Sequence, residues 1–145
     1  MHGYVLRRYG GPEGSLLADV PAPTPGPRDI LVAVRAAGLN PVDIKFRQGK
    51  PRAIHRPKLL LVLGNEFAGE VIGVGEDVKR FSLGDRVFAR VEKDRVGAFA
   101  EWAAVDEDYA AQMRPNLNLT TAAAVPLAAL TALQALKDEL GLNPG

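Results

Sequence analysis

The sequence has 145 residues, a nearly balanced charge (18 Lys and Arg against 17 Asp and Glu) and no cysteine. A chain of this length is usually one domain with its own core, and the balanced charge argues against nucleic acid or an anionic membrane as a partner. The lack of cysteine excludes disulfides, thiolate nucleophiles and cysteine-containing zinc sites. Because neither a signal-peptide pattern nor a membrane-spanning apolar run is present, we expect a cytoplasmic protein without membrane contact.

Short alternating apolar runs, separated by glycine and proline, predict a mainly β fold. The 15 glycines and 11 prolines are spread through the chain rather than clustered. Many short strands with such boundaries are typical of a barrel or a sandwich. The predicted strands, in chain order, are Gly3–Arg8, Ser15–Val20, Asp29–Ala37, Glu66–Val74, Asp85–Val91, Ala98–Val105 and Tyr109–Met113.

The segment "GNEFAGEVIGVG", residues 64–75, alternates small and bulky side chains. Its glycines predict kinks, bulges or close backbone approach in a strongly curved strand. The segment does not match the dinucleotide-binding fingerprint, because Glu76, Asp77 and Val78 follow where a third glycine is needed, and no crossover helix comes next.

From Leu119 onward the period becomes helical. Thr120 or Thr121 is predicted to cap a first helix, and Pro126 to start a second one through "LAALTALQALKDEL". Such a helix needs an apolar surface to cover, so we expect residues 120–145 to connect a domain at residues 1–119 to one beyond Gly145; the alternative is a helix packed back on its own barrel. The leucines that share one face are Leu127, Leu130, Leu133, Leu136 and Leu140.

The two histidines, His2 and His55, do not predict a metal site. Neither lies at helical or strand spacing from another good ligand, and basic residues flank His55, which we expect in a solvated loop. No serine, histidine and acid constellation is visible.

A set of polar residues near strand ends is the candidate site. Asn40 and Lys45 lie in "GLNPVDIK", and Thr131 lies on the last helix. An amide, an ammonium and a hydroxyl together suit a carboxamide, phosphate or enolate oxygen. The alternative is purely structural, since Asn before proline commonly forms a turn and Asp43 commonly closes one or caps the short helix that follows. Glu66, at the start of the predicted strand Glu66–Val74, also belongs to this set of polar residues near strand ends.

Four blocks that occur in order carry a family resemblance: "AAGLNPVDIKFRQG", "LGNEFAGEVIGVGEDVKRFSLGDRVFA", "GAFAEWAAV" and "AAAVPLAALTALQAL". The chain resembles the N-terminal, GroES-like catalytic domain of the medium-chain dehydrogenase/reductase superfamily, in its zinc-free quinone oxidoreductase and enone reductase branch. The resemblance covers nearly the whole chain and implies a GroES-like, partly open β-barrel that ends in helices leading to a Rossmann domain.

The same resemblance implies that no metal is bound. The zinc-dependent branch has a cysteine at the position of Asn40, a histidine at Asn65, and usually a third ligand near Leu127. The hydroxyl that relays a proton in the alcohol dehydrogenases corresponds to Val42. Alcohol oxidation through a zinc-bound alkoxide is therefore not expected.

For the zinc-free branch, the resemblance implies that Asn40 and Thr131 lie beside the nicotinamide of NADPH and that Lys45 faces the cleft. The implied reaction is hydride transfer to a quinone or an α,β-unsaturated carbonyl, in which Lys45, supported by Asn40, stabilises the developing charge on oxygen. Lysine at this position, where some relatives carry tyrosine, favours enones or enals. Asp43 and Glu66 are expected to hold the turn and the strand end.

In the superfamily a Rossmann domain follows the position of Gly145 and supplies most of the NADPH contacts and the dimer interface. We therefore expect a homodimeric full-length protein, and no detectable turnover by these 145 residues alone. Two alternatives remain open: a stand-alone GroES-like binding or assembly module that self-associates through its leucines, and an enoyl reductase within a larger synthase.

Overall fold

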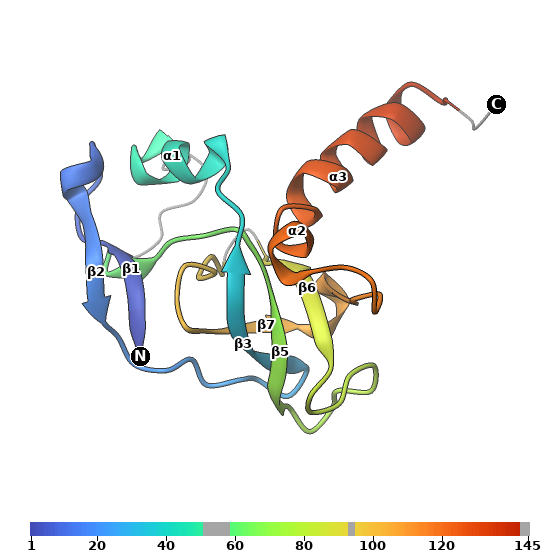
Figure 1. The fold of residues 1–145 in the computed structure, drawn as a ribbon. Coiled ribbons are helices and arrows are strands. Elements are labelled where there is room, and N and C mark those ends of the chain that lie inside the picture. Colours follow the sequence, from blue (N-terminus) through green and yellow to red (C-terminus); the bar gives the residue numbers. More distant parts are fainter. Residues whose placement is uncertain (51–58, 93–94, 143–145) are drawn as a thin grey trace.

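A computed structural model describes residues 1–50, 59–92 and 95–142 of the chain (Figure 1). Its strands form two antiparallel sheets, one with the order β7-β3-β5-β6-β8 and one with the order β2-β1-β4. The larger sheet curls into a partly open barrel, and the chain ends in helices, which confirms the predicted fold class. The elements are β1 (His2–Leu6), β2 (Ser15–Asp19), β3 (Asp29–Ala37), α1 (Pro41–Arg47), β4 (Leu61–Val62), β5 (Glu66–Val74), β6 (Arg86–Arg90), β7 (Trp102–Asp106), β8 (Ala110–Gln112), α2 (Leu119–Ala123) and α3 (Pro126–Leu133).

Strands β3 and β5 form the centre of the larger sheet, and both have the predicted bounds. Their pairing shifts register between Val34 and Ala36, and at Gly69 the two backbones approach closely. The glycines of β5 therefore allow a strongly curved pair of strands, as predicted. The best-buried core side chains come from these strands and their neighbours: Ile30, Val32, Phe67, Val71, Val87 and Val105.

One strand was missed and two local predictions were wrong. The two-residue strand β4, which pairs with β1, was not predicted at all. Strand β7 begins at Trp102 rather than Ala98, because Phe99 instead hydrogen-bonds Tyr4 of β1 and Leu63 through its backbone. The first C-terminal helix is capped by Asn118, whose Oδ1 accepts the Thr121 N–H at 2.8 Å, and not by either threonine.

Helix α3 leaves the barrel instead of packing back on it, so that alternative is wrong. Figure 1 shows α3 extending outward from the sheet, and a π-helical segment (Gln134–Glu139) continues it. Only its start lies against the barrel, where Pro126 is buried. The leucine face is accordingly exposed to solvent: 45% of Leu130, 56% of Leu133, 49% of Leu136 and 67% of Leu140.

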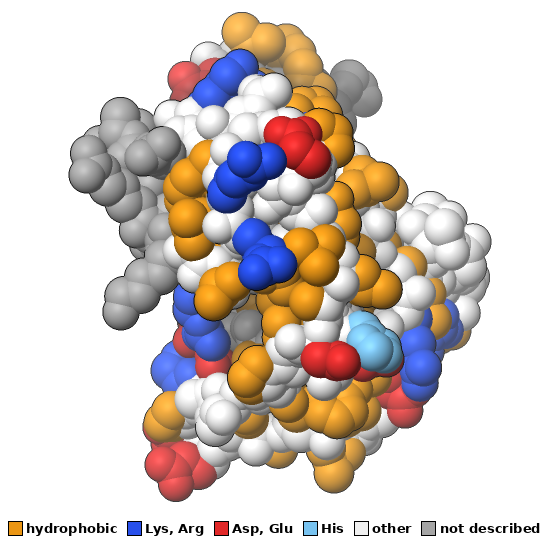
Figure 2. Space-filling model, turned by 90° about the vertical axis from the view of Figure 1, so that its left-hand side faces the viewer, with side chains coloured by type: hydrophobic (Ala, Val, Ile, Leu, Met, Phe, Trp, Pro, Cys, Tyr) orange, Lys and Arg blue, Asp and Glu red, His pale blue; other side chains and the backbone are white. Residues whose placement is uncertain are grey.

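One face of the molecule carries side chains of both charges. Figure 2 shows one face on which Lys, Arg, Asp and Glu alternate with hydrophobic side chains and no extended area has a single charge. This distribution agrees with the net charge of +1. In the part of the chain that the structure describes, none of the helices is both long and apolar enough to cross a bilayer.

An ion pair between Asp29 and Arg95 joins the start of β3 to the loop before β7. Arg95 Nη1 and Nη2 donate to the two Asp29 carboxylate oxygens at 2.9 and 2.6 Å, and Asp29 is only 4% exposed. The hydrogen bonds from Arg95 lower the pKa of Asp29, and the Gly26 N–H adds to this shift against the effect of burial. The paired carboxylate thus stabilises the fold above the ordinary aspartate pKa, and this contribution is lost as the pH falls through the lowered value.

We expect Arg95→Gln to raise the pH at which acid unfolds the protein. Without the guanidinium the pKa of Asp29 rises, so protonation begins at a higher pH and removes the stabilisation earlier. Circular dichroism during acid titration measures the midpoint. Arg114→Gln, at an exposed position, is the control and should leave the midpoint unchanged; equal midpoints for both variants would contradict the prediction.

Candidate functional site

Helix α1 begins at the predicted "GLNPVDIK" turn. Asn40 is its N-cap residue and Pro41 occupies the first helical position, where the missing proline N–H costs nothing. Asp43 Oδ2 accepts the Asn40 backbone N–H at 2.8 Å, as in a capping box, and Asp43 Oδ1 accepts from Asn65 Nδ2 at 2.6 Å. Both carboxylate oxygens are used, so Asp43 ties the start of α1 to the residue that precedes β5.

Glu66, at the start of β5, connects α1 to α3. Its Oε1 accepts from Asn40 Nδ2 at 2.6 Å and its Oε2 accepts the Leu127 N–H at 2.7 Å, while only 1% of the residue is exposed. Thr131 Oγ1 then donates to the Leu127 carbonyl oxygen at 2.8 Å. Asn40 and Thr131, which are 91 positions apart in the sequence, are thereby joined by three hydrogen bonds.

Gly38 allows this arrangement. A Cβ atom at position 38 would overlap Glu66 Oε1 and lie 2.8 Å from the Ala123 carbonyl oxygen. A residue with a side chain would therefore displace the Glu66 carboxylate or the end of α2.

The Asp43 carboxyl has a raised pKa. Burial is the main cause, and the negative charge of Glu66 adds to it, against hydrogen bonds from Asn65 and Asn40 that favour the ionised form. The folded protein therefore binds this proton more tightly than the unfolded chain does. Between the ordinary aspartate pKa, about 3.9, and the raised value, the contribution of Asp43 to stability falls as the pH increases.

We expect Asp43→Asn to remove this pH dependence, because the amide does not titrate. Relative to the variant, the wild-type protein should lose free energy of unfolding as the pH rises through that window. Urea unfolding at pH 4, 5, 6 and 7 measures the difference. Asp77→Asn, at an exposed position, should keep the wild-type slope, and parallel curves for wild type and Asp43→Asn would show that the prediction is wrong.

Two cavities are lined by residues of the hydrogen-bonded series, and a third lies nearby at the start of α3. The first, about 360 Å³, lies beside α1 and is lined by Tyr4, Asn40, Asp43 and Arg47, among others. The second, about 300 Å³, is lined by Val42, Arg90, Leu127, Leu130, Thr131 and Gln134.

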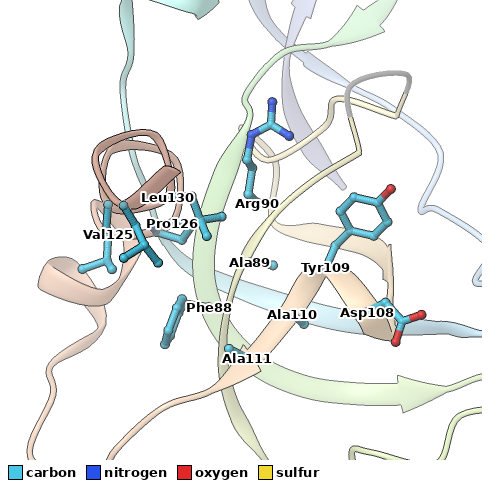
Figure 3. Close-up of a pocket in the computed structure, with 12 residues that line it drawn as sticks. Phe88, Ala89, Arg90, Asp108, Tyr109, Ala110, Ala111, Val125, Pro126 and Leu130 are labelled. Carbon is cyan, nitrogen blue, oxygen red and sulfur yellow. The ribbon is translucent and has the colours of Figure 1, made fainter. Parts of the chain in front are cut away.

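The third cavity, about 480 Å³, separates the start of α3 from β6 and β8. Figure 3 shows Val125, Pro126 and Leu130 on one side of it and Phe88 with Ala89 on the other. Arg90 extends away from Phe88 in this view. Arg90 and Leu130 also line the second cavity, so the two cavities are neighbours at α3.

The predicted site residues are thus brought together only in part. Asn40, Asp43 and Glu66 form one hydrogen-bonded cluster, and Thr131 joins it through Leu127. Lys45 does not belong to it: its side chain is exposed on α1 and lines none of the three cavities.

Asn65, Arg47 and Arg90 were not among the predicted site residues. Asn65 directly precedes Glu66, and Arg47 follows Asp43 by one helical turn, so both spacings were visible in the sequence. Arg90 lies opposite Glu66 in the β5–β6 register, which only the strand pairing reveals.

The residues at the cluster are poor ligands for a metal. Asn40 and Leu127 both direct N–H groups at the Glu66 carboxylate, which occupies its oxygens. Within residues 1–50, 59–92 and 95–142, no group of three or more His, Asp or Glu is placed to hold a metal ion. His2 is exposed and its Nδ1 lies 3.0 Å from Asp19 Oδ1, whereas His55 lies outside the described residues.

Comparison with known proteins identifies relatives of this fold. The model of the alcohol dehydrogenase GroES-like domain matches residues 26–115. A chloroplast envelope quinone oxidoreductase homolog from Arabidopsis thaliana is 37% identical over 144 residues, which are 99% of this chain and 44% of that protein. The chain thus spans less than half the length of the curated relatives it matches.

Solved structures of quinone oxidoreductases share the fold of this chain. The quinone oxidoreductase of Pseudomonas syringae superposes with a TM-score of 0.90 at 32% identity, over 99% of this chain and 43% of that one. The Escherichia coli quinone oxidoreductase, solved in complex with NADPH, superposes with a TM-score of 0.89 at 29% identity, over the same shares of the two chains. Since the family model covers more than half of the residues, the chain belongs to the alcohol dehydrogenase GroES-like domain family, and its relatives are quinone oxidoreductases of the medium-chain dehydrogenase/reductase superfamily.

Proposed function

We propose that this chain is the substrate-side domain of an NADPH-dependent oxidoreductase that reduces quinones or α,β-unsaturated carbonyls by hydride transfer, without zinc. The observation that carries the proposal is the hydrogen-bonded series from Asn40 through Glu66 and Leu127 to Thr131. It holds an amide and a hydroxyl in fixed positions on either side of a buried carboxylate, which is the preorganisation that a binding site requires.

The residues at the second cavity fit the nicotinamide end of NADPH. Thr131 donates its own proton to Leu127, so its oxygen is left to accept an N–H from a carboxamide. Val42, Leu127 and Leu130 supply an apolar wall against which a flat ring can lie. When bound, NADPH supplies the hydride; the chain's residues would position the ring and exclude water from one of its faces.

Several further features belong to the same proposal. We divide the chain into a GroES-like domain at residues 1–119 and a helical connection at residues 120–145 that leads to a nucleotide-binding domain. The full-length protein is proposed to be a homodimer. The role of Lys45 in stabilising charge on the substrate oxygen stays a prediction, although its exposed side chain lines none of the three cavities. Asp43 and Glu66 are proposed to hold Asn40 in place. Cytoplasmic location stays a prediction.

The test begins with the intact mass of the native protein, found in its source cells by peptides of this sequence. A mass about twice the 15.5 kDa of these residues, together with NADPH oxidation that depends on an added quinone or enone, is the expected result. The 145-residue chain alone should show no such oxidation at 340 nm. An NADPH-dependent rate from the isolated chain would refute the prediction that these residues alone are inactive. No such rate from the native protein would overturn the proposed function.

A second candidate, from a different class, is a stand-alone GroES-like binding or assembly module. It is favoured by the exposed leucines of α3 and its continuation, which would pair in a self-associated form. A native mass of 15.5 kDa, with association that Leu133→Asp abolishes in sedimentation, would favour this candidate over the reductase.

A further inference from the structure

Arg90, the last residue of β6, lines both cavities at α3. It shares the cavity of about 480 Å³ with residues of β8, and the cavity of about 300 Å³ with Thr131 and Gln134. The residue is half-buried, so water solvates its guanidinium only in part. A partly desolvated cation is costly unless a negative group compensates its charge.

No carboxylate in the described part of the chain compensates Arg90. Glu66 lies opposite it in the β5–β6 register, but both Glu66 oxygens accept the hydrogen bonds described above, and the described residues include no ion pair between the two. Asp108 also lines the larger cavity, yet it is paired with Arg28 and Arg80. Figure 3 shows the Arg90 guanidinium pointing away from Asp108. The positive charge of Arg90 is therefore available to a ligand.

Helix α3 and its continuation supply a second donor at the smaller cavity. Their lining residues recur at intervals of three or four and so share one helix face: Leu127, Leu130, Thr131 and Gln134. Within residues 1–50, 59–92 and 95–142, the Gln134 side chain has no hydrogen bond, which leaves its amide N–H groups free to donate. The Thr131 hydroxyl already donates to Leu127 and offers only an acceptor.

The charge at this position fits a carboxylate. Among the described residues, neither cavity is lined by a lysine or by a second arginine, so one positive charge is available. A phosphate group carries about −1.5 to −2 at pH 7, whereas a carboxylate carries a single charge and matches the planar guanidinium with its two oxygens. Apolar walls beside Arg90, formed by Phe88, Pro126 and Leu130 among others, suit the uncharged part of such a molecule.

We propose that the substrate is an α,β-unsaturated carbonyl compound that carries a carboxylate, and that Arg90 binds this carboxylate. The inference rests on the proposed function and names its substrate class. Because Arg90 and Thr131 line the same cavity, the carboxylate lies beside the proposed position of the nicotinamide. Arg90 is thus a specificity-determining residue that favours acidic substrates over neutral ones.

The first test measures binding without NADPH, on the 145-residue chain, which has its own buried core. The probes are trans-3-benzoylacrylate, an anionic enone, and its methyl ester, which has the same enone without the charge. The chain contains no cysteine, so no thiol adds to either probe. In ¹⁵N-labelled protein, the arginine Nε–H signal that disappears in Arg90→Gln identifies Arg90. We expect this signal to shift with the acid, and the acid to bind at least about 10-fold more tightly than the ester.

Two variants with the same change in net charge complete the test. Arg90→Gln should bind the acid at least about 10-fold more weakly than the wild type and bind the ester equally well. Arg114→Gln, at an exposed position outside both cavities, should bind both probes as the wild type does. Equal affinity of the wild type for acid and ester, or equal weakening in the two variants, would overturn the inference. A shift of the Arg90 signal with inorganic phosphate but not with the acid would overturn it in favour of a phosphate group.

Kinetics of the native protein separate this inference from the proposed function. NADPH oxidation with the ester at the same kcat/KM as with the acid would overturn the inference and leave the proposed function intact. Arg90-dependent binding of the acid, without NADPH oxidation by the native protein with any quinone or enone, would instead overturn the proposed function.

Discussion

Replacing Glu66 with alanine should lower the free energy of unfolding by about 3–5 kcal/mol. The substitution removes the acceptor of two hydrogen bonds and leaves the Leu127 N–H and the Asn40 amide without their partner in a site that is almost fully buried. Hydrogen bonds to a charged group contribute about 1.5–3 kcal/mol each. A cavity at position 66 adds to this loss.

Urea unfolding followed by the fluorescence of Trp102, the single tryptophan, measures this change. Glu70→Ala is the matched control, because Glu70 lies on the same strand with an exposed side chain. It should change stability by no more than about 0.5 kcal/mol. Amide exchange at Leu127 gives a local check: the N–H should lose protection in Glu66→Ala and keep it in Glu70→Ala. Similar stabilities for the two variants would show that Glu66 does not connect α1 to α3.

Replacing Gly69 with alanine should destabilise the fold by about 3 kcal/mol or more. A Cβ at position 69 would overlap the Ala33 carbonyl oxygen and lie 2.7 Å from Val32 Cγ1. The obstacle is backbone in the paired strand, so relief requires β3 and β5 to separate next to the register shift between Val34 and Ala36.

The same unfolding experiment tests this prediction. Gly97→Ala is the control, since the nearest atom to its added Cβ is the Arg95 carbonyl oxygen at 4.0 Å. We expect that variant to stay within about 1 kcal/mol of the wild type. If Gly69→Ala were as stable as Gly97→Ala, the close approach of β3 and β5 would not be required for the fold.

The sequence was most informative where one pattern had one structural solution. The alternation in β3 and β5 predicted both strands with their observed bounds, because a curved strand with a buried face needs period-two apolar residues and glycines. The sequence was least informative where the pairing between strands decides which residues form a strand. Strand β4 has two residues and no periodicity, and Ala98 begins no strand because its neighbours bond to β1 and the Leu63 backbone instead of β3.

At the helical end of the chain, the sequence again predicted the element but not its packing. The leucine spacing predicted a helix, and α3 with its continuation forms one. Spacing alone left open whether that face packs on the barrel. Only the direction in which α3 leaves Pro126 determines that Leu133 and Leu140 lie in solvent.

By itself the sequence determined the fold class, the curved central strands, the family resemblance and the residue types of the candidate site, since these depend on local periodicity and on motifs. The tertiary structure decided which of those residues meet. Glu66 contacts Asn40 and Leu127, 26 and 61 positions away, because the close approach at Gly38 brings the ends of β3, β5 and α2 together. The exposure of Lys45 is likewise a property of how α1 packs, and no spacing along the chain encodes it.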